Sequence, residues 1–68
     1  MIKLYTKTGC PYCSKKREEF NRTGVVYEEI NVYEVAGAED ELVKITGGIR
    51  KVPVIVDGAK VIIAPEGG

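Results

Sequence analysis

Cys10-Pro11-Tyr12-Cys13 holds both cysteines of this chain, separated by two residues. The apolar character of residues 2–6 predicts a strand just before this stretch, and Pro11 suits the first position of a helix, where its missing N–H is no loss. Cys10 would then cap the helix, and Cys13 would lie in its first turn. The unpaired N–H groups and the dipole at a helix N-terminus favour the thiolate form of cysteine, which is the nucleophilic form. The pair is therefore a candidate site for thiol–disulfide exchange.

The chain is 68 residues long, which allows one small domain over residues 1–68. A disulfide across two intervening residues closes a very short loop and constrains the unfolded chain little, so the pair is a poor structural staple. No secretory signal is visible after Met1, and no apolar run approaches the roughly 20 residues that span a bilayer. We therefore expect a cytoplasmic protein with no membrane partner, where a Cys-x-x-Cys pair is typically redox-active or metal-binding.

The charge and the missing histidine exclude several classes of function. Ten acidic and ten basic residues give a net charge of zero, which offers no reason to expect a nucleic-acid partner. Without histidine, the chain can form neither a Cys–His catalytic pair nor a zinc site with two Cys and two His ligands. Two cysteines also fall short of the four soft ligands of a closed zinc or iron–sulfur site, so we expect no metal site within one chain.

Hydrophobic patterning and turn residues predict alternating strands and helices. Gly24 ends the first helix, Gly47-Gly48 ends the second, and Asp57-Gly58 is a hairpin turn signal. We expect strands at 2–6, 25–32, 52–56 and 60–64, helices at 11–23 and from 35 or 36 to 46, and a terminal loop at 65–68. This β-α-β-α-β-β order predicts an α/β fold with a mixed four-stranded sheet and a right-handed crossover.

The whole pattern, with Cys-Pro-Tyr-Cys opening the first helix and Lys51-Val52-Pro53 opening the third strand, resembles the dithiol glutaredoxins. The resemblance covers essentially the whole chain and implies a minimal thioredoxin-like fold. It also implies that Pro53 is a cis-proline facing the two cysteines. The backbone of Val52 would pair with bound glutathione or with a disulfide substrate.

The resemblance extends to other candidate substrate-binding residues. Lys7 stands where family members carry a basic side chain, and a cation there would stabilise the Cys10 thiolate and attract a glutathione carboxylate. Tyr12 would line the substrate groove with its ring. Arg50 or Lys51 would meet a glutathione carboxylate. The alternative for each of these side chains is an ordinary surface role without any contact to substrate.

Two features depart from the family pattern. Family members usually continue past a Gly-Gly pair into an acidic or hydroxyl residue and a last helix, whereas this sequence stops at Gly67-Gly68. We therefore expect an incomplete pocket for the γ-glutamyl end of glutathione and a poorly covered sheet face. Lys16 and Glu19 stand where many members have small or apolar residues. Both features bear on glutathione specificity more than on redox chemistry.

The leading hypothesis is a thiol–disulfide oxidoreductase of glutaredoxin type that reduces protein disulfides or glutathione mixed disulfides. Glutathione would be its co-substrate, it would bind no cofactor, and it would be a monomer or a dimer. Cys10 would attack the substrate disulfide as thiolate, and Cys13, more buried and with the higher pKa, would resolve the mixed disulfide. In a one-cysteine route, a second glutathione would clear Cys10 and leave Cys13 dispensable.

Three other hypotheses stay open from the sequence. One is a glutaredoxin-like electron carrier fed by thioredoxin reductase, although Pro11-Tyr12 favours glutathione. Another is a binding module in which two chains share a zinc ion or a [2Fe–2S] cluster through their Cys10 thiolates, against which Pro11 argues. The third is a redox-inert scaffold in which both cysteines are buried core residues.

Overall fold

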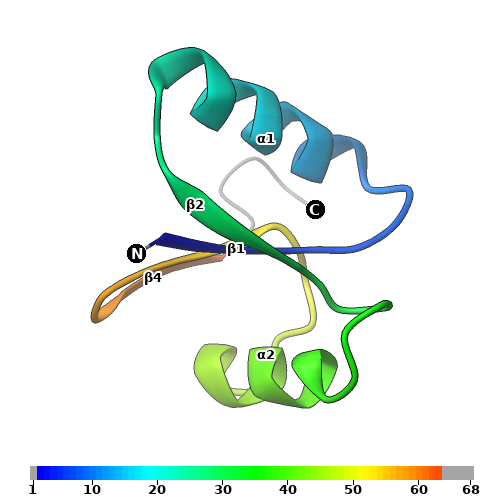
Figure 1. Ribbon diagram of the computed structural model, residues 1–68. Helices are drawn as coiled ribbons and strands as arrows, with labels where there is room; N and C mark the ends of the chain where they lie inside the picture. Colours follow the sequence, from blue (N-terminus) through cyan, green and yellow to red (C-terminus); the bar gives the residue numbers. More distant parts are fainter. Residues whose placement is uncertain (1, 64–68) are drawn as a thin grey trace.

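The computed structural model describes residues 2–63 and confirms the expected order of strands and helices (Figure 1). Its elements are β1 (Ile2–Thr6), α1 (Pro11–Thr23), β2 (Tyr27–Asn31), α2 (Ala38–Thr46), β3 (Val54–Asp57) and β4 (Lys60–Ile63). The terminal loop that we expected at 65–68 lies outside the described residues.

The four strands form one mixed sheet in the order β2-β1-β3-β4. β1 pairs in parallel with β2 and antiparallel with β3, and β3 pairs antiparallel with β4. The predicted fold class is therefore confirmed. Because β1 and β3 run in opposite directions, the end of β1 that leads toward the cysteines lies beside the start of β3.

The two helices cover opposite faces of the sheet (Figure 1). Side chains of a strand alternate between its faces, so neighbouring residues of β1 join different cores. Leu4 packs with Phe20 of α1 in one cluster, whereas Tyr5 packs with Leu42 of α2 in the other. Thr6 follows the Leu4 side and is fully buried. The last residue of β1 thus supplies one polar group to the face of the sheet that α1 covers.

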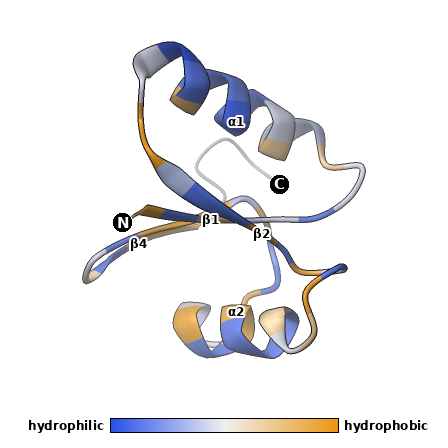
Figure 2. Cartoon of the chain, viewed as in Figure 1, coloured by the Kyte–Doolittle hydropathy of each residue, from blue (hydrophilic) through white to orange (hydrophobic). Residues whose placement is uncertain are grey.

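α1 docks on the sheet through a narrow stripe of buried residues. The buried residues of this helix are Cys13, Lys16 and Phe20, and the rest of its surface is mainly hydrophilic (Figure 2). The Phe20 ring packs against Tyr27 of β2 with centroids 5.1 Å apart. The aliphatic stem of Lys16 therefore takes the place of an apolar residue in the stripe.

α2 buries Ala38 and Leu42 and is tied to the sheet by one polar contact. The hydroxyl of the buried Tyr5 donates a hydrogen bond of 2.5 Å to Oε1 of Glu41. Neither helix among residues 2–63 is long and apolar enough to cross a bilayer.

The expected bounds of β2 and α2 were too wide. The N–H of Val25 bonds to the carbonyl of Phe20 and so belongs to the end of α1, which leaves β2 to begin at Tyr27. The N–H of Val35 bonds to the carbonyl of Asn31 in a turn. α2 begins only after Gly37, whose φ of 79° is a left-handed conformation that favours glycine.

The expected bounds of β3 were shifted by two residues at its start. Pro53 has no N–H to donate to a strand ladder, and β3 begins at Val54. At the other end β3 includes Asp57, which pairs with Lys60 across the hairpin. β4 begins at Lys60 as expected, and its expected last residue, Ala64, lies outside the described residues.

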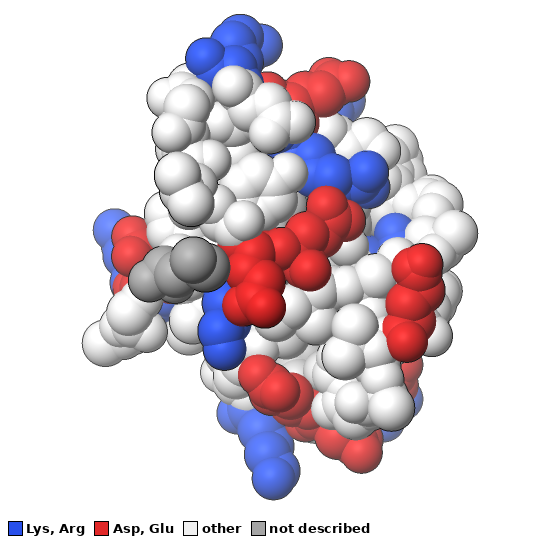
Figure 3. Space-filling model, viewed as in Figure 1, with Lys and Arg blue, Asp and Glu red and all other residues white. Residues whose placement is uncertain are grey.

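Charged side chains lie along β2, which is an edge of the sheet. Glu28 and Glu29 of this strand are exposed, and acidic atoms cross the middle of the face in Figure 3. Charges on an edge strand discourage pairing with strands of other molecules. The same face carries basic side chains beside the acidic ones (Figure 3).

Candidate active site

Cys10 is the N-cap of α1, as the sequence predicts. Its backbone is extended, with φ −88° and ψ 112°, and Pro11 follows at the start of the helix. The Cys10 sulfur accepts a hydrogen bond from the backbone N–H of Cys13 at 3.2 Å. The cap therefore places a backbone donor on the sulfur, an arrangement that stabilises negative charge there.

Cys13 lies deeper than Cys10, and both are free thiols. Cys13 is fully buried, whereas Cys10 is 6% exposed. The pKa of the Cys13 thiol is raised from its ordinary 9.0 to about 11, mainly by burial and then by the hydrogen bond with Cys10. A hydrogen bond to the backbone of Lys7 and the positive charge of Arg17 lower it. Cys13 is thus protonated at neutral pH, a state that does not attack disulfides.

The Val52–Pro53 segment lies against Cys10 although the two are distant in the sequence. The peptide bond between Val52 and Pro53 is cis, as the resemblance implied. Both residues are buried, and the Val52 carbonyl oxygen is 4.0 Å from the Cys10 sulfur. Pairing of Tyr5 with Val54 aligns the end of β1 with the start of β3 and so brings these loops together.

A pocket of about 270 Å³ is lined by residues of α2, by Lys7 of the loop before Cys10 and by the residues that follow β2. Lys7 and Arg50 bring positive charge to it, and Glu39 brings a carboxylate whose Oε1 is 3.6 Å from Nη1 of Arg50. The full lining consists of Lys7, Val32, Tyr33, Glu39, Leu42 and Arg50. Two cations over an apolar floor suit a small ligand that carries a carboxylate.

The other candidate residues lie outside the pocket lining. Tyr12 is 37% exposed, and Nζ of Lys15 lies 5.7 Å from the centroid of its ring. Lys51 is exposed, next to the buried Val52. Substrate contacts of Tyr12, Lys51 and Val52 stay predictions.

Sequence reasoning missed Glu39 and Tyr33 as pocket residues. An acid in the first turn of a helix is explained by the helix dipole alone, so Glu39 carried no special signal. Tyr33 is a large, exposed ring directly after the buried Val32, a contrast that only the structure shows. Neither sequence position identifies a pocket without the fold.

Within residues 2–63, no three side chains among His, Cys, Asp and Glu gather where they could hold a metal ion.

The family of the chain follows from comparison with known proteins. The family model described as glutaredoxin matches residues 2–62. The chain belongs to the glutaredoxin family. This glutaredoxin is 40% identical over 55 residues to glutaredoxin 1 of Rickettsia prowazekii, in a match that covers 79% of the chain and 58% of the relative. It therefore spans a little over half the length of the Rickettsia relatives that it matches.

Solved structures confirm the thioredoxin-like fold of this glutaredoxin. The thioredoxin-like protein BC3987 superposes with a TM-score of 0.84 at 28% identity, over 93% of this chain and 85% of that one. The buckwheat glutaredoxin–glutathione complex superposes with a TM-score of 0.76 at 29% identity, over 91% of this chain and 58% of that one.

Proposed function

We propose that this glutaredoxin is a thiol–disulfide oxidoreductase that uses glutathione to reduce protein disulfides and glutathione mixed disulfides. One observation carries the proposal: the Cys10 sulfur caps α1, with the Cys13 N–H at 3.2 Å and the Val52 carbonyl at 4.0 Å. Membership of the glutaredoxin family supports the chemistry, and the buckwheat relative in complex with glutathione supports the choice of reductant.

The proposed cycle begins with an attack by the Cys10 thiolate on a substrate disulfide. A bond forms between Cys10 and one substrate sulfur, the substrate bond breaks, and the departing thiolate takes a proton from solvent. Cys13 then loses its proton to solvent and attacks the Cys10 sulfur, which releases the second substrate thiol and forms the Cys10–Cys13 disulfide. Two glutathione molecules reduce this disulfide and leave as glutathione disulfide.

The pocket supplies the proposed site for a glutathione carboxylate. Lys7 and Arg50 line this pocket and supply its positive charge. Val52 would pair its backbone with the peptide, beside the cis-proline Pro53. Tyr12 and Lys51 complete the proposed binding set at its edge.

The proposed setting is the cytoplasm, where the glutathione pool keeps thiols reduced. The proposed working form is a monomer, because each step uses residues of one chain. No cofactor takes part in the cycle.

The decisive experiment compares wild type with Cys10→Ser and Cys13→Ser on a glutathionylated peptide. Glutathione and glutathione reductase supply electrons in one series, and thioredoxin reductase supplies them in the other. We expect turnover with glutathione, none in Cys10→Ser, and retained deglutathionylation in Cys13→Ser by the one-cysteine route. Turnover with thioredoxin reductase alone would assign the chain to the electron-carrier alternative. An inactive wild type in both series would remove the proposal.

A further inference from the structure

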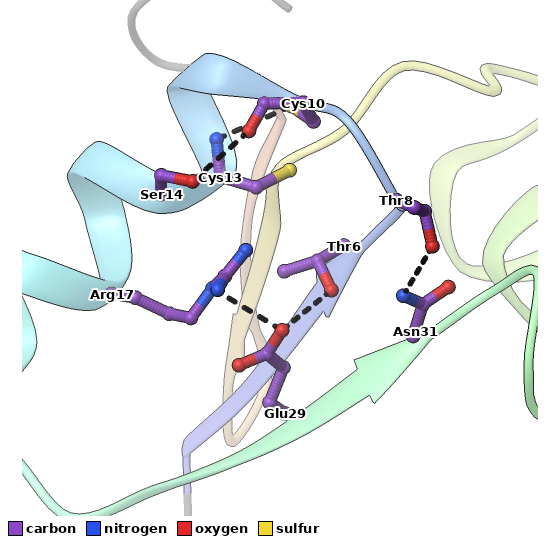
Figure 4. A network of polar contacts seen from close by, with 8 residues as sticks. All are labelled: Thr6, Thr8, Cys10, Cys13, Ser14, Arg17, Glu29 and Asn31. Carbon is purple, nitrogen blue, oxygen red and sulfur yellow. Dashed lines mark hydrogen bonds and ion pairs between the residues drawn. The ribbon is translucent and has the colours of Figure 1, made fainter.

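A chain of polar contacts runs from the sheet to α1 below the two cysteines (Figure 4). The parallel register of β1 and β2 pairs Leu4 with Glu29 and Thr6 with Asn31. Alternation then puts the side chains of Thr6 and Glu29 on the same face, toward α1. The hydroxyl of the fully buried Thr6 donates to Oε2 of Glu29 at 2.9 Å.

Arg17 meets the same carboxylate oxygen from the helix. Its Nε lies 3.3 Å from Oε2 of Glu29, and this nitrogen is itself buried. No hydrogen bond forms at Nε within residues 2–63, so the contact is an ion pair. Oε2 of Glu29 is therefore shared by a hydroxyl donor from β1 and a cation from α1.

Arg17 also lies one helical turn after Cys13, on the same side of α1. In Figure 4 the guanidinium group extends toward Cys13 while Glu29 lies on its other side. The charge of Arg17 lowers the pKa of the Cys13 thiol and is the smallest of the effects that act on it. The other groups that act on this thiol are Cys10 and the backbone of Lys7.

We propose that Thr6 and Glu29 position the Arg17 guanidinium beside Cys13, and that this cation promotes proton loss from Cys13 when it resolves a mixed disulfide. The inference rests on the proposed function, because resolution is the step in which Cys13 acts. Arg17 is a positioning and electrostatic residue here, since it takes no part in bond making. The proton goes to solvent, and the electron pair left on sulfur attacks Cys10.

The arrangement answers a specific difficulty of this site. A fully buried thiol is a poor acid, because burial penalises its charged form. The Arg17 side chain is 39% exposed, but its Nε is buried, and a buried charged nitrogen is costly without a partner. Pairing Arg17 with Glu29, and Glu29 with Thr6, holds the cation close to the sulfur.

The test measures Cys13 ionisation in a Cys10→Ser background, which needs no turnover. Thiolate absorbance is followed against pH, together with the rate of alkylation. Arg17→Gln should reduce the Cys13 thiolate fraction at a fixed pH by roughly threefold to tenfold, because a nearby opposite charge favours the charged form. Arg17→Lys should restore part of the loss, which a packing role of the side chain would not explain.

A matched control and a double-mutant cycle make the result specific. Arg22→Gln removes the same charge from the last turn of α1 and should leave Cys13 unchanged. The effect of Arg17→Gln should be smaller in a Glu29→Gln background than without it, because Glu29 holds the guanidinium in place. Circular dichroism confirms that each variant is folded.

The possible results test the role of Arg17, the role of Glu29 and the proposed function separately. Equal effects of Arg17→Gln and Arg22→Gln, or no effect of either, would overturn the role of Arg17. Full additivity with Glu29→Gln would overturn the positioning role of Glu29. An active wild-type enzyme with an unchanged Arg17→Gln variant removes this inference alone, whereas an inactive wild type removes the proposed function.

Discussion

The hydroxyl of Tyr5, in the middle of the sheet, is bonded to the carboxylate of Glu41 on the solvent-facing side of α2. Tyr5 is fully buried, so its hydroxyl depends on this one partner among the contacts of the described residues. The bond spans 36 positions of sequence and fixes α2 to β1. Its loss should lower the stability of the fold, while the Tyr5 ring keeps its packing in the cluster that contains both cysteines.

Tyr5→Phe should lower the free energy of unfolding by about 1 kcal/mol. A hydrogen bond to a charged group contributes about 1.5–3 kcal/mol, and the exposed Glu41 regains part of this by returning to water. For a domain of this size, that change lowers the melting temperature by about 4–8 °C. Thermal unfolding measures it, and Glu41→Gln is the matched variant because it keeps an acceptor. A stability equal to wild type in Tyr5→Phe would contradict this reading of the bond.

The reduced protein should lose stability as the pH rises above about 9. The ordinary pKa of 9.0 for Cys13 is raised to about 11 by burial first, so the folded state holds a proton that the unfolded state has lost. The stabilising contribution is complete below the unfolded value and disappears as the pH rises through the folded one. Urea unfolding at a series of alkaline pH values measures this slope.

Tyr5 should also make the free energy of unfolding fall with rising pH, but at higher pH than Cys13 does. Burial, and then the nearby Glu41 carboxylate, raise the pKa of Tyr5 above its ordinary value of 10.0. A Cys13→Ser variant should therefore show a flatter dependence in the first part of the alkaline range and keep the later part. Identical slopes in both proteins would show that Cys13 does not titrate as described.

The two cysteines should react with iodoacetamide at very different rates at neutral pH. Cys10 is 6% exposed and receives the N–H of Cys13, whereas Cys13 is fully buried. Burial raises the pKa of Cys13 to about 11, and thiolate is the form that reacts. Mass spectrometry after short labelling should find the label on Cys10. Equal labelling of both residues would argue against an ordered division between attack and resolution.

Glu39→Gln should lower the KM for glutathione, on the proposed function. Glu39 lies 3.6 Å from Arg50, so it competes with any ligand carboxylate for that cation. An exposed ion pair contributes at most about 1 kcal/mol, which limits the expected change to roughly fivefold. Arg50→Gln should raise the KM instead, with kcat unchanged in both variants. Opposite signs in the two variants identify competition, and a change of the same sign would refute it.

Most of the fold could be predicted from local signals. Pro11 and Gly24 bound α1, and Asp57-Gly58 set the final hairpin. The expected bounds failed where backbone hydrogen bonds decide them, as at Val25, whose N–H serves the end of α1 rather than β2. A β-branched residue at a helix end cannot be told from the start of a strand by composition alone.

Some residues of the candidate site could be predicted from the sequence, and others could not. Cys10, Cys13 and Pro53 were visible because a short motif and a family pattern hold them. Glu29 and Arg17 were not, because their contact depends on the register of β1 with β2 and on the turn of α1 above them. Long-range register is not encoded in any short stretch of the sequence.

The alternation along β1 separates two kinds of consequence for mutations at adjacent positions. Tyr5 faces α2, and changes there should be measured in melting temperature. Thr6 faces α1 and contacts Glu29, and changes there should be measured in the chemistry of the thiols. A protein engineer can therefore change stability through the hydroxyl of one residue and thiol chemistry through the next, but must keep the ring of Tyr5, which packs in the same cluster as both cysteines.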